Sequence, residues 1–202
     1  MDKNIGMISS LVNLLAVISF AICMLVGSDF GSYISSMFIA FGFVPMMCAF
    51  NTYGKKGSLT AGHAAIAFSA MYAVVIFLVY FAQVTTVRLD SLSEQSSQII
   101  NYQNFGLFFN YDLLGYCFMA LATFFAGLTI DAKTKPDKWL KALLIIHGIF
   151  AISCLIIPML GMFSKDMAGG NITGVLVLEF WCIYFIPIGI LSTIYFKKSF
   201  NN

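Results

Sequence analysis

The sequence predicts an all-α integral membrane protein: a single bundle of six transmembrane helices, with both termini cytoplasmic and a longer outer loop between helices three and four. Two observations predict this fold. Of the 202 residues, 60% are hydrophobic and only 10% are charged, whereas soluble domains are nearer half apolar and a quarter charged. The apolar residues also gather in six stretches of about 18 to 25 residues, the length that a helix needs to cross the hydrocarbon.

The six stretches are continuous apolar runs, without the short alternating segments of a transmembrane β-barrel. Helices are expected because lipid offers no partner for unpaired backbone groups. The first stretch is interpreted as a retained helix, since it is longer than the apolar region of a signal peptide and no A-x-A-like site follows it. We expect one polytopic domain over residues 1–202, with helices at 7–27, 33–50, 63–87, 113–130, 142–163 and 172–196.

The lysines and arginines predict the orientation. Nine of the eleven fall in the N-terminal tail, the second and fourth connections and the C-terminal tail, and two, Arg88 and Lys165, fall on the other side. Because cytoplasmic loops carry the excess of basic residues, both termini are expected inside, in the plasma (inner) membrane. The outer connection 88–111 begins with polar SLSEQSSQ and continues with aromatic IINYQNFGLFFNY, so we expect a short interfacial helix, either a passive loop or a functional lid.

Several function classes have no support. The net charge of +2 is small and the basic residues are spread over several loops, so no nucleic-acid partner is expected. Each of the five cysteines lies in an apolar segment, as packing thiols do, and no metal site or cofactor is expected. The motifs GxSxG, HExxH and GxxxxGK[ST] are absent from the sequence, so no catalytic residue is assigned.

Glu179 is the most prominent candidate site residue. It lies within VLVLEFWCIYF, about eight residues inward from the outer end of helix six. An ionisable group at that depth costs at least about 2.5–3.5 kcal/mol on insertion scales, so it must be protonated, paired or facing a wet cavity. A protonated glutamic acid that bonds a neighbouring helix is the structural alternative.

Other polar residues fall on helical stripes that we expect to face the bundle interior. Asp112 is expected at the outer edge of the hydrocarbon and Arg88 at the rim as a counter-ion. His147 and Asn13 are expected in the inner half, in the opposite leaflet from Glu179. Interhelical hydrogen bonding alone also explains such stripes. The candidate ligand-binding residues are Glu179, Asp112, Gln83, Tyr80, Tyr116, His147 and Asn13.

Three functions remain open. The first is binding or transport of a small amphipathic solute, which could be cationic, in an outer-facing pocket. The second is a non-catalytic partner, sensor or immunity subunit that contacts another membrane protein. The third is an intramembrane enzyme acting on lipid, with Glu179 and His147 as acid and base.

In size, helix number and cytoplasmic termini the chain is similar to the substrate-binding subunits of energy-coupling vitamin transporters. The small-residue repeat by which those subunits dock their partner is not evident in SSLVNLLAVISFAIC, so no residue's role is carried over.

Overall fold

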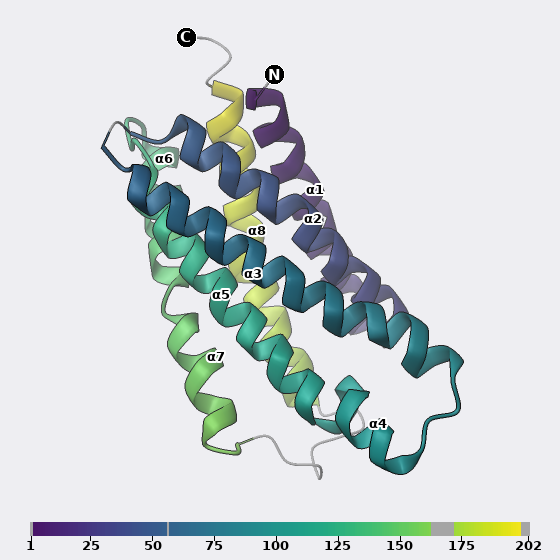
Figure 1. Cartoon of the computed structure of the whole chain (residues 1–202). Coiled ribbons are helices and arrows are strands. Elements are labelled where there is room, and N and C mark those ends of the chain that lie inside the picture. The colour runs from purple at the N-terminus through teal and green to yellow at the C-terminus, as the bar shows by residue number, and fades with distance from the viewer. Residues whose placement is uncertain (1, 56, 163–171, 199–202) are drawn as a thin grey trace.

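The computed structural model describes residues 2–55, 57–162 and 172–198. Within these ranges every regular element is a helix, and six helices are long and apolar enough to cross a membrane. This confirms the predicted all-α class and its six long apolar helices (Figure 1).

Five of the six spans are α1 (Asp2–Leu25), α2 (Asp29–Tyr53), α3 (Leu59–Ala82), α5 (Leu107–Thr129) and α8 (Ile172–Lys198). α3 continues into a π-helical turn, η1 (Gln83–Val87). The remaining span is divided into α6 (Lys135–His147) and α7 (Phe150–Met159). The connection between η1 and α5 holds a short helix, α4 (Glu94–Ile100), and a 3-10 turn, η2 (Tyr102–Asn104).

Five of the six helices start four to seven residues earlier than predicted, and the two largest differences, at α5 and α6, each have a local reason. α5 begins at Leu107, six residues before the predicted 113, because the aromatic end of the outer connection is itself helical. α6 begins at Lys135, seven residues before the predicted 142. There Thr134 and Asp137 form a capping box, with Pro136 in the first turn, so the helix starts in charged sequence ahead of the apolar run.

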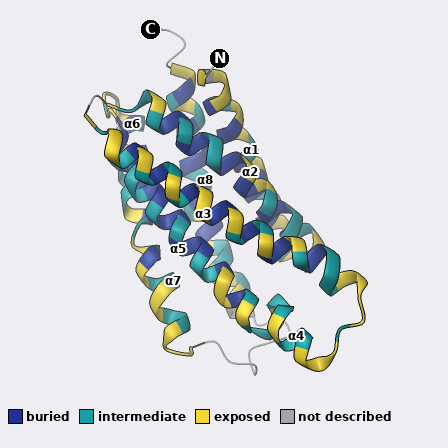
Figure 2. Ribbon diagram, viewed as in Figure 1, coloured by how far each residue is buried: buried dark blue, intermediate teal, exposed yellow. Residues whose placement is uncertain are grey.

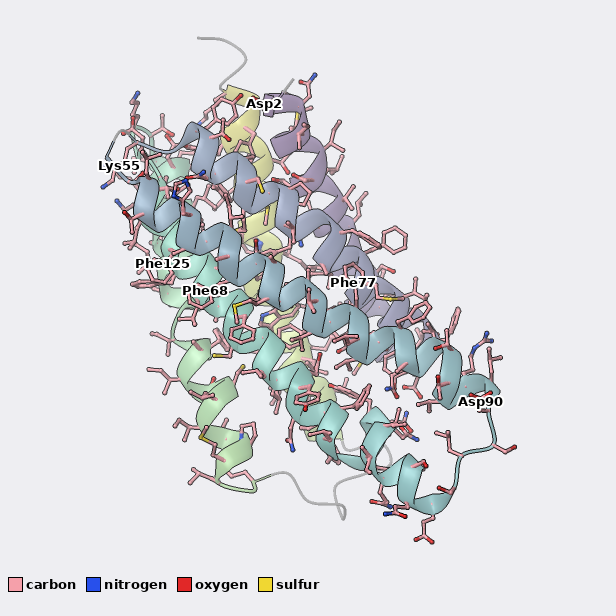
Figure 3. All side chains as sticks on the ribbon, viewed as in Figure 1. Asp2, Lys55, Phe68, Phe77, Asp90 and Phe125 are labelled. Atoms are coloured by element: carbon pink, nitrogen blue, oxygen red, sulfur yellow. The ribbon has the colours of Figure 1, made fainter. Side chains whose placement is uncertain are left out.

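The spans pack side by side in a ring. α1 contacts α2 and α8, α3 lies between α2 and α5, α6 joins α5 to α8, and α7 packs on α5. α2 and α5 are the most buried spans, while the outward faces of α3 and α7 are exposed (Figure 2). On the outward face of α3 and α5, Phe68 stacks on Phe125 with ring centroids 5.8 Å apart (Figure 3).

The first turns of α1 and the last turns of α2 and α8 meet at one end of the bundle, which we name the termini end. Tyr195 donates a hydrogen bond to the Tyr53 carbonyl (3.3 Å), and Lys198 pairs with Asp137 (3.4 Å). Asp90 lies at the opposite end, which we name the α4 end (Figures 1 and 3). Both ends of the described chain therefore lie at the same end of the bundle (Figure 1).

Candidate functional site

A cavity of about 370 Å³ lies within the ring of helices and extends inward from the α4 end. Asp29 and Gln103 line its rim, and His147 and Trp181 line its deep end. Its walls come from α1, α2, α3, α5, α6, α7, α8 and the connection that holds η2, and they are mainly apolar and aromatic. Such a concave, largely apolar cavity with a few polar groups is the usual form of a small-molecule site.

Asp112 is the buried acid of this cavity. Its side chain is only 2% exposed. The Tyr102 hydroxyl donates to Oδ2 (3.2 Å), Tyr80 lies beside the carboxyl, and Oδ1 has no hydrogen-bond partner among the described residues. Asp112 is buried by the protein more fully than its expected place at the outer edge of the hydrocarbon implies, because α5 starts six residues earlier than predicted and the outer connection folds over it.

No basic side chain balances this carboxyl among the described residues. The described part of the cavity wall contains two acids, Asp112 and Asp29, and neither lysine nor arginine. Arg88, the predicted counter-ion, instead donates from Nε to the Val84 carbonyl (3.0 Å), and its guanidinium lies over the Phe30 ring, 5.0 Å from the centroid. Asp29 accepts a hydrogen bond from Gln103 at the rim (2.6 Å).

Three tyrosines from three separate segments surround the mouth beside Asp112; we name Tyr33, Tyr80 and Tyr102 the tyrosine trio. Their ring centroids are 5.4 Å (Tyr33–Tyr80), 6.0 Å (Tyr33–Tyr102) and 5.8 Å (Tyr80–Tyr102) apart. Burial, and then the nearby Asp112 carboxyl, raise the pKa of the Tyr102 hydroxyl well above its usual range. Tyr102 therefore keeps its proton and acts as a donor to Asp112.

Gln83 holds this arrangement in place instead of lining the large cavity. Its side-chain amide donates to the Ile100 carbonyl (2.9 Å), and its Oε1 accepts from the Tyr102 backbone N–H (3.0 Å). The two bonds tie both ends of the turn between α4 and η2 to η1, which continues the C-terminal end of α3. Gln83 thereby sets the position from which Tyr102 reaches Asp112.

His147 lies at the deep end with both ring nitrogens occupied. Trp181 donates from Nε1 to His147 Nε2 (3.1 Å), so Nε2 is an acceptor. The Thr123 hydroxyl donates to the Ala120 carbonyl (2.8 Å), so it accepts from Nδ1 of His147 (2.8 Å). The imidazole is therefore a neutral Nδ1–H tautomer, fully hydrogen-bonded, that fastens α6 to α5 and α8.

The depth predicted for His147 is wrong. Because α6 begins at Lys135, His147 is twelve residues along the helix, about 18 Å at 1.5 Å per residue. Its partner Trp181 is two residues from Glu179, so His147 and Glu179 lie at a similar level of the bundle, not in opposite leaflets. With both His147 nitrogens engaged elsewhere, the two do not form a hydrogen-bonded acid–base pair.

The structure does not bring Glu179 and Asn13 into the cavity. Glu179 is half-buried on another face of α8, and its Oε1 has no hydrogen-bond partner among the described residues. Asn13 is fully buried where α1 meets α2, and it donates to the Ile39 carbonyl (2.9 Å). The helices approach so closely there that a Cβ on Gly42 would lie 2.7 Å from the backbone nitrogen of Asn13.

Of the seven candidates, Asp112, Tyr80, Tyr116 and His147 line the cavity, and Gln83 supports it. Tyr116 contacts Trp181 with centroids 5.4 Å apart, and its hydroxyl has no hydrogen-bond partner among the described residues. Sequence reasoning missed Tyr33, Tyr102 and Trp181. The aromatic and amide-rich half of the outer connection was the signal for Tyr102, and the neighbouring Glu179 was the signal for Trp181.

The site has no features of a metal centre within the described ranges, where no three His, Cys, Asp or Glu side chains gather to hold an ion. Comparison with known proteins adds no assignment: no family model, no curated protein and no solved structure matches the chain. The arrangement of the residues themselves is therefore the basis for a functional proposal. It offers one buried carboxylate oxygen, several aromatic faces and an apolar interior.

Proposed function

We propose that this multi-pass membrane protein binds, and in its cellular setting transports, a small amphipathic solute in the cavity around Asp112. The single observation that carries the proposal is the buried, unpaired Oδ1 of Asp112 on the wall of an apolar cavity. A buried polar atom without a partner costs roughly 1–3 kcal/mol. A bound solute that supplies the missing partner removes this cost.

The proposal places the α4 end outside the cell and the termini end in the cytoplasm. All the lysines that the positive-inside rule assigns to the cytoplasm belong to the first turn of α1, the first two turns of α6, the last turn of α8, and the connections at the termini end. The cavity then faces outward, in the plasma membrane. A lipid bilayer surrounds the exposed apolar faces of α3, α7 and α8.

Thermal unfolding of the detergent-purified chain with a panel of small amphipathic solutes tests the proposal. A bound solute raises the midpoint in proportion to the logarithm of its concentration over its dissociation constant. Asp112→Asn is expected to abolish that rise. Glu179→Gln, which changes an acid outside the cavity, is the matched control and is expected to keep it. A panel that leaves the midpoint unchanged would refute the proposal.

The two other functions draw less support from the geometry. A non-catalytic partner or sensor needs only a closely packed bundle, which leaves the cavity and the unpaired Asp112 oxygen without a role. An enzyme acting on lipid needs a free base, whereas His147 has both nitrogens hydrogen-bonded.

A further inference from the structure

We infer that the solute is a monovalent organic cation, an ammonium group carried on an apolar body. The inference rests on the proposed function, because it names the chemical class of the solute for the same cavity. Three features of the wall carry it: its charge, its aromatic faces and its apolar depth.

The charge of the wall has one sign. Asp112 and Asp29 are its acids, and no lysine or arginine lies among its described residues. A carboxyl buried away from water is ionised only beside a partner of opposite charge. Since the described part of the wall supplies none, a bound cation is the partner that completes the site. An anionic solute would meet only repulsion there.

The unpaired carboxylate oxygen and the tyrosine trio indicate which kind of cation fits the site. Oδ2 of Asp112 already accepts from Tyr102, which leaves Oδ1 for one further contact. The rings of Tyr33 and Tyr80 have centroids 5.4 Å apart beside it. A cation is attracted to an aromatic face within about 6 Å of the centroid, which is the way quaternary ammonium groups are held in proteins.

The same features are unsuited to a metal ion. Divalent cations such as Ca²⁺ take six to eight oxygen ligands and Mg²⁺ takes six, whereas this wall presents a single unpaired carboxylate oxygen at depth. Tyrosine rings attract a cation through their faces and do not replace a metal's hydration shell. A soft, poorly hydrated ammonium group therefore fits better than a small inorganic ion.

The apolar part of the cavity wall accommodates the apolar body. Phe20, Met24, Phe150, Val177 and Leu178 belong to this part of the wall. Burying the apolar body there contributes about 25 cal/mol for each Å² removed from water. The site thus combines one charge contact at Asp112 with a hydrophobic slot, and the solute must carry both parts.

A matched pair of probes tests the inference on the unmodified full-length chain. Benzyltrimethylammonium carries a fixed positive charge, and neopentylbenzene has the same shape with carbon in place of nitrogen. By equilibrium binding in detergent, we expect the cation to bind at least about tenfold more tightly than its neutral isostere. We expect Asp112→Asn to remove this preference and Glu179→Gln to keep it.

The outcomes separate the inference from the proposed function. If the isostere binds as tightly as the cation, the inference is wrong while the binding site stands. The inference is also wrong, and the binding site stands, if an anionic or neutral solute of the panel binds in an Asp112-dependent manner while the cation does not bind. If no solute of any charge binds, the proposed function itself fails. The probe comparison uses the unmodified chain, so it holds even if Asp112→Asn does not fold.

Discussion

Two buried ionisable side chains in this bundle have opposite environments. His147 gives and receives a hydrogen bond at its two nitrogens, so nothing is left for a solute. Asp112 keeps one oxygen without a partner and meets no basic side chain in the described wall. Both are candidate site residues in the sequence, and only their partners in the structure distinguish a residue that joins helices from one that is free to bind a solute.

His147→Leu should destabilise the fold. Removing the imidazole leaves the buried Trp181 N–H without a partner, at roughly 1–3 kcal/mol, and leaves the Thr123 hydroxyl with only its bond to the Ala120 carbonyl. A fall of several degrees in the thermal unfolding midpoint is expected. His63→Leu is the control, because His63 is exposed near the start of α3, and it should leave the midpoint unchanged. Equal midpoints for the two variants would contradict the structural role of His147.

The ring of Tyr33, more than its hydroxyl, should determine cation affinity. Tyr33→Phe keeps an aromatic face at the mouth and is expected to bind benzyltrimethylammonium almost as well as the parent chain. Tyr33→Leu removes the face, worth about 0.5–2 kcal/mol, and is expected to weaken binding several-fold in the same equilibrium assay. The reverse order of the two variants would show that the hydroxyl, not the ring, makes the contact.

Acidification should weaken binding of a probe with a fixed charge. A proton and an ammonium group compete for the Asp112 carboxyl, so affinity is expected to fall as pH is lowered and to recover on return. The titratable groups that face Asp112 from α2, α3, η2, α5 and α7 are five tyrosines and one cysteine. These side chains are uncharged at neutral pH and gain no proton on acidification. They are Tyr33, Tyr72, Tyr80, Tyr102, Tyr116 and Cys154.

Asp29 at the rim is the other acid of the described cavity wall. Asp29→Asn is therefore the control for the pH series, measured by the same equilibrium binding at each pH. We expect this variant to keep the dependence on pH and Asp112→Asn to lose it. Binding that stays constant across pH in the parent chain would argue against a carboxylate contact.

At the scale of the elements, the sequence predicts the apolar interior of each span well and its ends poorly. Length and hydropathy specify where lipid must surround a helix. The first turns of α5 and α6 lie outside the apolar runs and depend on local partners, such as the Thr134–Asp137 cap. The buried position of Asp112 follows from those added turns, so the apolar pattern alone could not predict it.

The placement of the outer connection depends on pairings that no spacing encodes. The sequence predicts a short helix somewhere in 88–111, and α4 is that helix. The hydrogen bonds from Gln83 to Ile100 and Tyr102 join residues 17 and 19 positions apart. Those bonds bring Tyr102 over the cavity, which is why Tyr102 was absent from the predicted site.

Gln83→Leu should release this connection without unfolding the bundle. The variant leaves the Tyr102 N–H and the Ile100 carbonyl without their partner, so Tyr102 loses its fixed position beside Asp112. We expect faster amide hydrogen exchange over residues 94–104 and weaker cation binding, with most of the thermal stability kept. Thr85→Val, a change in the same π-helical turn at a partly buried side chain whose hydroxyl donates to the Phe81 carbonyl within the same helical segment, should alter neither. Unchanged exchange in Gln83→Leu would remove the positioning role.

At the scale of the whole molecule, charge and depth are arranged along one axis. The described ion pairs, Lys133–Asp131 and Lys198–Asp137, both lie at the termini end. The α4 end presents Asp29, Asp90 and Glu94 beside a single described basic residue, Arg88. In the proposed orientation the lysine-rich end lies in the cytoplasm, and the acidic end, where the cavity begins, attracts cations from outside the cell.

This axis predicts which connections a reagent can reach from outside intact cells. Asp90→Cys places a thiol at the α4 end, and Lys55→Cys places one at the termini end (Figure 3). A membrane-impermeant maleimide is expected to label Asp90→Cys in intact cells and Lys55→Cys only after the cells are opened. The parent chain, whose five native cysteines lie within the spans, gives the background. Labelling of Lys55→Cys alone in intact cells would invert the orientation and turn the cavity, with its cation site, towards the cytoplasm.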